Sequence, residues 1–209
     1  MWYRKFAVIL LFICFVAADS AGVQKILQIS KEKGTVTEYK DPYHTIKKEV
    51  SYFPVAESKW DERKTVAYGD SFMMERTYGG KRGHEGCDIM ASYNHTGVYP
   101  VVSVCDGTLE KIGWLPQGGW RLGIRSKTGV YYYYAHLSDY MKEYQIGEQI
   151  RAGEVIGFMG DTGYSDTPGT TGNFPVHLHF GVYFDDESGK EFSCLLYTSP
   201  SPRDISGSR

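Results

Sequence analysis

Short runs of apolar, aromatic and β-branched residues, each bounded by glycine or other turn residues, dominate the chain from about residue 65 onward. Runs of this length and composition are typical of β-strands joined by tight turns. The candidates are residues 65–68, a strand beginning near Asp88, and residues 99–104, 108–114, 121–126, 130–136 and 174–181. Residues 137–145 are expected to form a helical turn, and residues 146–160 short strands with tight bends. The pattern predicts an all-β domain built on an antiparallel sheet.

The last of these strands carries two histidines. Side chains alternate between the two faces of a strand, so His177 and His179 point to one face, and Val176, Leu178 and Phe180 point to the other, toward a core. The two histidines could be surface residues on an edge strand, or they could belong to a metal or catalytic site. Two further stretches of the sequence favour the second interpretation.

The first of these stretches runs from Arg76 to Asp88 and is rich in glycine. Glycine disfavours a helix, so His84 and Asp88, four residues apart, are not the paired ligands of a helical zinc motif. We expect instead a loop that carries His84 and turns at Gly86 into the strand that begins near Asp88.

The second stretch is the tyrosine-rich run that ends at His136. Strict alternation would place Tyr132, Tyr134 and His136 on one face of this strand. Catalytic zinc needs three nitrogen or oxygen ligands and an open fourth position. His84, Asp88 and one of the two histidines of the last strand would supply the ligands. The remaining histidines, His136 among them, would be free to transfer protons.

Both ends of the chain differ in character from this domain. Residues 1–18 combine Arg4 and Lys5 with a short apolar run and small residues, which predicts a signal peptide cleaved after Ala18; an uncleaved anchor is the alternative. Residues 19–50 are interpreted as a polar spacer and residues 51–193 as the folded domain. Residues 194–209, rich in serine and proline, are interpreted as a disordered, non-native tail. The mature protein is expected to be secreted from a bacterial cell or associated with the cell wall, with no membrane attachment after cleavage.

Export changes the interpretation of the cysteines. Once the signal peptide is removed, Cys87, Cys105 and Cys194 remain. A Cys87–Cys105 disulfide is predicted between adjacent antiparallel strands, with two buried free thiols as the alternative. Three cysteines without paired spacing exclude a tetrathiolate zinc site.

Composition and charge add little to this picture. The net charge is only −2 over 209 residues, so bulk electrostatics gives no reason to expect binding to nucleic acid or to an anionic membrane. The 17 tyrosines and 24 glycines suit a β-rich domain with tight turns or an aromatic-lined groove.

The order His-x-x-x-Asp, then Ala-His-Leu, then His-x-His resembles the lysostaphin-like (LytM-type) zinc endopeptidases of bacterial cell walls, over about residues 66–185. Flanking motifs that fit the resemblance include Asp106-Gly107, Gly147-Glu148 and Gly160-Asp161. The resemblance implies a single, strongly curved antiparallel sheet with an open groove formed by long loops. It implies that His84, Asp88 and His179 bind one Zn²⁺ and that His136 and His177 are catalytic. The expected partners are peptidoglycan peptides, and the protein is expected to act as a monomer.

Tyr78 lies six residues before His84 in the glycine-rich segment. A phenol near the zinc site could be catalytic by donating a hydrogen bond to the developing oxyanion, or it could pack under its own loop. The loop of residues 161–175 is longer than the corresponding connection in the family, which leaves the shape of the groove open.

Three functions fit these residues. The first is an active, zinc-dependent endopeptidase of bacterial peptidoglycan. The second is an inactive module of the same fold that binds peptidoglycan or a partner, and the third is a zinc peptidase that acts on exported proteins. Because all the expected ligands are present, the sequence favours the first.

Overall fold

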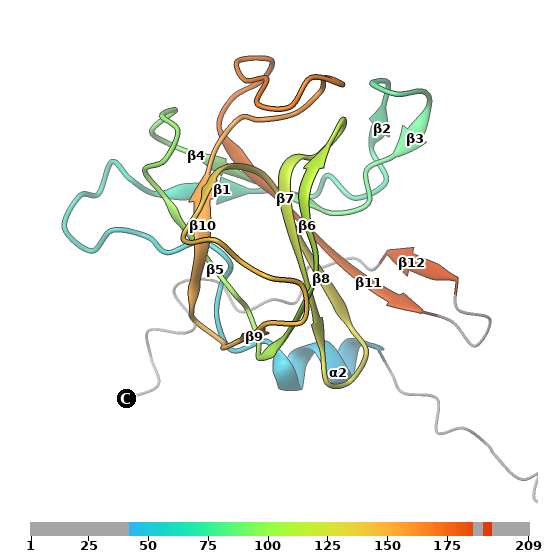
Figure 1. Cartoon of the computed structure of the whole chain (residues 1–209). Coiled ribbons are helices and arrows are strands. Elements are labelled where there is room, and N and C mark those ends of the chain that lie inside the picture. The colour runs from blue at the N-terminus through green and yellow to red at the C-terminus, as the bar shows by residue number, and fades with distance from the viewer. Residues whose placement is uncertain (1–41, 186–189, 194–209) are drawn as a thin grey trace, which may run out of the picture. The chain divides into compact units, whose positions relative to one another are not determined.

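A computed structural model of the chain describes residues 42–185 and 190–193 (Figure 1). The predicted signal peptide, most of the predicted spacer and the tail of residues 194–209 lie outside the described residues. In the part of the chain that is described, no helix has the length and apolar character needed to cross a membrane.

The described residues confirm the all-β prediction. Ten strands form one sheet with the central order β1 (Val66–Tyr68), β4 (Cys87–Ala91), β11 (His177–Asp185), β8 (Tyr131–Tyr140), β7 (Gly119–Ser126), β6 (Gly107–Leu115) and β9 (Gln149–Ile150). The remaining members are β10 (Val155–Met159), which pairs with β5 (Pro100–Val102) and β8, and β12 (Glu191–Ser193), which pairs with β11. Each of these pairs is antiparallel. A separate hairpin joins β2 (Glu75–Arg76) to β3 (Arg82–Gly83).

Strand β8 changes partners at His136. Residues 131–135 pair with β11, whereas residues 137–140 pair with β10. On the opposite edge, Arg121 of β7 faces both Ala135 and His136, which is the arrangement of a β-bulge. The backbone of His136 has a φ of +61°, a conformation that is uncommon for a residue with a large side chain. The sheet therefore bends at the residue that the sequence predicts to be catalytic.

The expected helical turn at residues 137–145 is wrong, because residues 137–140 belong to a strand and residues 141–145 form a bend and irregular chain with no helix. Leu137, Asp139 and Tyr140 pair with residues of β10, so β8 continues to Tyr140. The local sequence did not indicate this, because the strand depends on hydrogen bonds to a partner that follows it in the chain.

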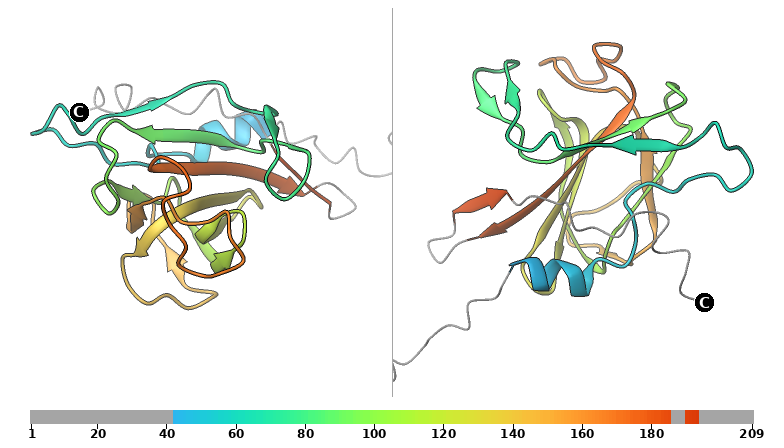
Figure 2. Two further views of the ribbon diagram at one scale, coloured as in Figure 1. Left: turned by 90° about the horizontal axis from the view of Figure 1, so that it is seen from above. Right: turned by 180° about the vertical axis from the view of Figure 1, so that it is seen from behind.

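The domain begins earlier than the predicted boundary at residue 51. Residues of the predicted spacer form helix α2 (Pro42–Glu49), and Ile46 and Val50 are buried in the core cluster. The Glu49 carboxylate accepts hydrogen bonds from the Tyr132 and Thr128 hydroxyls. Figures 1 and 2 show α2 lying across the ends of the long strands, opposite the end that carries the β2–β3 hairpin. This polar segment folds because its few apolar residues pack into the hydrophobic core of the domain.

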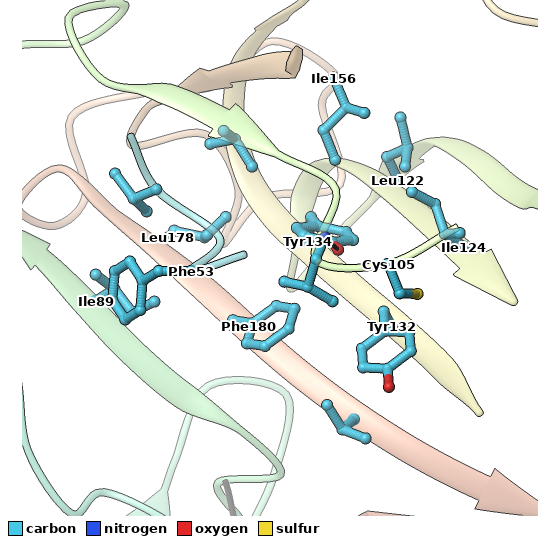
Figure 3. Packing of buried hydrophobic residues seen from close by; sticks show 14 of the residues in the cluster. Phe53, Ile89, Cys105, Leu122, Ile124, Tyr132, Tyr134, Ile156, Leu178 and Phe180 are labelled. Atoms are coloured by element: carbon cyan, nitrogen blue, oxygen red, sulfur yellow. Dashed lines mark hydrogen bonds between the residues drawn. The ribbon is translucent and has the colours of Figure 1, made fainter. Parts of the chain in front are cut away.

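The core lies on the face of the sheet occupied by Leu178 and Phe180, as the alternation of β11 predicts (Figure 3). Tyr132 and Tyr134 are fully buried in the same cluster, where their rings pack against Phe180. The prediction that His136 shares their face is wrong. The bulge adds one residue to β8 between Tyr134 and Leu137, which breaks the strict alternation of side chains. The His136 ring therefore points away from the core tyrosines.

The predicted Cys87–Cys105 disulfide is also wrong. Both thiols are free, as in the alternative, but only Cys105 is buried and Cys87 is partly exposed. Cys87 begins β4, which pairs with β1 and β11, whereas Cys105 follows β5, which pairs with β10. The two residues are therefore not on adjacent strands. Burial raises the pKa of Cys87 to about 11 and that of Cys105 to about 12, so both thiols stay protonated at neutral pH.

Candidate metal centre

The register between β4 and β11 brings two of the predicted ligands together. Asp88 lies directly opposite His179, and residues paired in this way point to the same face of an antiparallel sheet. His84 arrives from the preceding loop and is buried, and its Nδ1 lies 2.9 Å from the carbonyl oxygen of Ser71. A carbonyl can only accept, so Nδ1 carries the proton and Nε2 keeps its lone pair.

Three ligand atoms converge at this point. His84 Nε2 lies 2.8 Å from His179 Nδ1 and 3.0 Å from Asp88 Oδ1, and His179 Nδ1 lies 3.1 Å from Asp88 Oδ1. A tetrahedral zinc ion with bonds of ~2.0–2.1 Å would hold its ligand atoms ~3.3 Å apart. The three atoms are thus close to the spacing that zinc requires, and two imidazoles with one carboxylate form a typical ligand set for catalytic zinc.

Gly86 makes room for this cluster. A Cβ atom at this position would lie 2.7 Å from the carbonyl oxygen of Phe180 and 2.8 Å from Nε2 of His179. Both contacts are shorter than real Cβ contacts, so a side chain here would displace the His179 ring. The sequence predicts a turn at Gly86, and the structure adds that a glycine is required there by this close approach.

The two predicted catalytic histidines lie beside the ligands. The ring centroids of His136 and His177 are 4.6 Å apart, and His177 Nε2 lies 3.8 Å from Asp88 Oδ1. Nδ1 of His136 lies 2.7 Å from the Thr162 carbonyl oxygen, and Nδ1 of His177 lies 2.8 Å from the Pro175 carbonyl oxygen. Each Nδ1 therefore donates to the backbone, and each Nε2 is left as a base.

Burial controls the ionisation of this group. It lowers the pKa of His136, and the neighbouring His177 and His179 lower it further. Burial likewise lowers the pKa of His177 and of His179, so these rings are neutral at pH 7. Burial alone would raise the pKa of Asp88, but the close contacts with the His179 and His84 imidazoles outweigh it and hold the pKa well below its usual value. Neutral imidazoles and an ionised carboxylate are the forms that bind metal.

Sequence reasoning missed Arg76 as part of the site. Its guanidinium forms an ion pair with Asp88 Oδ2, the carboxylate oxygen that faces away from His84. The only signal was its place in the glycine-rich segment before His84. The carbonyl groups of Ser71, Thr162 and Pro175, which orient three imidazoles, had no signal at all, because every residue has a carbonyl group.

A pocket opens next to the predicted ligands. Its lining includes His136 and His179, with the aromatic rings of Tyr133, Tyr164 and Tyr183 around them. Arg82 and Glu85 add charged groups to the lining, and Gln117 and Gly118 complete it. The tyrosines bear out the expectation of an aromatic-lined groove.

Tyr78 reaches this pocket through another tyrosine. Its ring stacks on that of Tyr164 with centroids 4.6 Å apart, and the Tyr164 ring lies edge-on to His136 at 5.9 Å. Tyr164 belongs to the long loop before β11, and Phe174 of the same loop also packs on His136. The aromatic residues of this loop thus cover one side of the site. The role of Tyr78 as an oxyanion donor stays a prediction.

The other two histidines lie outside the site. His95 stacks on Tyr93 in a loop, and its Nδ1 lies 3.2 Å from the Thr96 carbonyl oxygen. His44 is exposed on α2.

Comparison with known proteins agrees with this geometry. The profile of peptidase family M23 matches residues 82–190, a range that contains all the predicted ligands and catalytic histidines. The chain is 44% identical over 124 residues to an L-Ala–D-Glu endopeptidase of Bacillus subtilis, a match covering 59% of this chain and 36% of that protein. It is 36% identical over 83 residues to lysostaphin of Staphylococcus staphylolyticus, covering 39% of this chain and 15% of that protein. The chain therefore spans only a small part of the length of these relatives.

A solved structure from Ruminococcus gnavus, described as a lytM glycyl-glycine endopeptidase, is 45% identical and superposes with a TM-score of 0.67. That similarity covers 83% of this chain and 68% of the other. The matches confirm the resemblance that the motifs indicate. With the profile spanning more than half of its residues, the chain belongs to peptidase family M23.

Proposed function

We propose that the protein is a zinc-dependent endopeptidase that hydrolyses peptide bonds of bacterial peptidoglycan. The observation that carries the proposal is the convergence of His84 Nε2, Asp88 Oδ1 and His179 Nδ1 within 3.1 Å of one another, beside two further imidazoles. The names of its relatives, L-Ala–D-Glu endopeptidase and lysostaphin, support peptidoglycan as the substrate. We propose further that the protein acts as a secreted monomer, after residues 1–18 are removed.

In this proposal, His84, Asp88 and His179 hold one Zn²⁺. When bound, zinc supplies a Lewis acid that lowers the pKa of a water molecule toward ~7 and polarises the scissile carbonyl group. Arg76 holds the Asp88 carboxylate in position through its second oxygen. The Ser71 carbonyl does the same for His84.

His136 and His177 carry out the proton transfers. Each ring has its Nδ1 proton engaged with a backbone carbonyl group, so Nε2 is the atom that can take a proton from the attacking water. Burial keeps both rings neutral, which is the form that a base needs. The imidazolium that results can then donate the proton to the amine that leaves. Loop residues Tyr164 and Phe174 pack on His136 and limit access of bulk water to it.

One experiment separates this function from its alternatives. Purified peptidoglycan and an unfolded exported protein are each incubated with the zinc-loaded enzyme, with the chelator-treated enzyme, and with the enzyme after zinc is restored. Release of new amino termini from peptidoglycan, lost with chelator and recovered with zinc, is the expected result. Binding to peptidoglycan without hydrolysis would identify an inactive module. Hydrolysis of only the protein substrate would identify a peptidase of exported proteins.

A further inference from the structure

One charged side chain in the pocket has a buried donor group that nothing in the described structure uses. Arg82, at the start of β3, lines the pocket beside His179, and its Nε is enclosed without a hydrogen-bond acceptor. Among the described residues, no carboxylate forms an ion pair with Arg82. A guanidinium nitrogen that is shielded from water and lacks an acceptor favours the approach of an anion.

A second arginine lies on the same face of the sheet. Arg121 precedes Leu122, which is fully buried in the core, so the Arg121 side chain leaves the sheet on the opposite face. Its partner on β6 is Gly113, which has no side chain to cover it. Both Nε and Nη1 of Arg121 are enclosed without acceptors, and no ion pair is found for this residue in the part of the chain described.

The neighbouring Arg125 differs from these two arginines, because its guanidinium is fully engaged by carboxylates. Arg125 lies on the same strand and face, four residues further along, and forms ion pairs with Glu110 and Asp185. This face of the sheet therefore does provide carboxylates that can pair with an arginine. The two arginines without such a partner, Arg82 and Arg121, are those near the catalytic histidines.

Tyr133 connects the two unpaired arginines. It lines the pocket with Arg82, and it lies on the same face as Arg121 because its β7 partner is Gly123, two residues further along. Burial raises the pKa of the Tyr133 phenol to about 12, and Arg121 and Arg82 both act in the opposite direction, so both cations lie close to this ring. The one carboxylate in the pocket lining, that of Glu85, forms no ion pair with either arginine in the described structure.

We propose that Arg82, supported by Arg121, binds a free carboxylate of the substrate directly beside the bond that is cut. The inference rests on the proposed function and names its substrate class: acidic peptides of peptidoglycan rather than glycyl-glycine bridges. A glutamyl residue has two carboxyl groups, and the chain continues through only one of them. A bond between alanine and glutamate therefore has a free carboxylate next to it, whereas a glycyl-glycine bond has none.

The test compares two synthetic peptides that contain an L-Ala–D-Glu bond and differ in one group. In the first, the free carboxylate of the D-glutamyl residue is intact, and in the second it is an amide. The zinc-loaded enzyme is expected to hydrolyse the first with a kcat/KM at least about tenfold higher, because the amide cannot make the charge-assisted hydrogen bonds. Arg82→Gln should remove this preference and Arg121→Gln should reduce it, while zinc content stays normal in both. Arg125→Gln is the control, since it removes the same charge from a paired arginine and should leave the preference intact.

The outcomes are distinct. Equal hydrolysis of the two peptides by the unaltered enzyme would overturn the inference and leave the proposed function standing. Equal loss of activity on both peptides in Arg82→Gln would also overturn it, since a structural role affects both substrates alike. Hydrolysis of neither peptide, in a preparation that also fails to degrade purified peptidoglycan, would overturn the proposed function and the inference with it. Arg82→Lys, which keeps the charge, should retain part of the preference and guards against a variant that does not fold.

Discussion

Nη2 of Arg76 lies 2.5 Å from Oδ2 of Asp88, while the other oxygen of the same carboxylate faces His84 and His179. The arginine thus fixes one oxygen and leaves the second for a metal ion. Arg76→Gln should lower the affinity for zinc by about 10–100-fold, the usual size of an effect from a group that orients a ligand. Turnover at saturating zinc should change little.

Zinc affinity in this variant can be measured by competition with a chromophoric chelator. Arg63→Gln is a suitable control, because Arg63 forms an ion pair with Asp61 that is exposed and remote in sequence from the ligands. An unchanged zinc affinity in Arg76→Gln would show that Asp88 is held by other contacts.

Replacing the acidic ligand should remove the metal. Asp88→Ala takes away one of three ligand atoms and leaves His84 and His179 without an anion between them. Most of the bound zinc should be lost, as measured by mass spectrometry of the metal content, and hydrolysis should fall with it. Asp139→Ala, an exposed position on β8, serves as the control. Near-stoichiometric zinc in Asp88→Ala would contradict the ligand assignment.

His136 should contribute to chemistry and little to metal binding. Its Nδ1 is engaged with the Thr162 carbonyl group, and it is not among the three converging ligand atoms. His136→Ala should keep its zinc while kcat falls by about a hundredfold or more, the effect of losing a general acid–base group. His95→Ala, in a loop outside the site, should have normal kcat and zinc. Loss of zinc together with activity in His136→Ala would mean that His136 is a ligand.

The phenol of Tyr78 separates a catalytic role from simple packing. If its hydroxyl group stabilises the oxyanion, Tyr78→Phe should lower kcat by about 10–1000-fold with KM and zinc content nearly unchanged. The ring that remains can still stack on Tyr164, so the substitution tests the hydroxyl group alone. Tyr93→Phe, a second stacked tyrosine, is the control. Normal cleavage of cell walls by Tyr78→Phe would leave Tyr78 with a packing role only.

The hydrogen bond between α2 and β8 should matter for stability and not for catalysis. Tyr132 is fully buried, and its hydroxyl group donates to Glu49. Glu49→Ala leaves that hydroxyl group without an acceptor, which should lower the free energy of unfolding by about 1–3 kcal/mol. Tyr132→Phe combined with Glu49→Ala should cost less than the sum of the single changes, because no buried donor is then left unsatisfied. Denaturant unfolding at a fixed zinc concentration measures this, and additive losses would contradict it.

The sequence alone determined the residue types of the site and the sheet that carries them. The alternation in β11 placed His177 and His179 on one face and Leu178 and Phe180 on the other, because side chains in a regular strand must alternate. Glycine at position 86 marked the turn into β4 for an equally local reason, its preference for turns, although the close approach that excludes a side chain there is made by the distant Phe180 and His179. These features depend on a few neighbouring residues and can therefore be read along the chain.

Only the tertiary structure decided where His136 points, how far the domain extends and whether Cys87 and Cys105 lie close enough to form a disulfide. A bulge between β7 and β8 turns His136 away from Tyr132 and Tyr134, and strict alternation cannot predict an inserted residue. Helix α2 is held by contacts with strands about 80 residues away in sequence, as in the bond between Glu49 and Tyr132, so its polar sequence resembled a spacer. The order of strands separated Cys87 from Cys105. In each case the deciding contact joins residues far apart in the chain, and no local pattern records it.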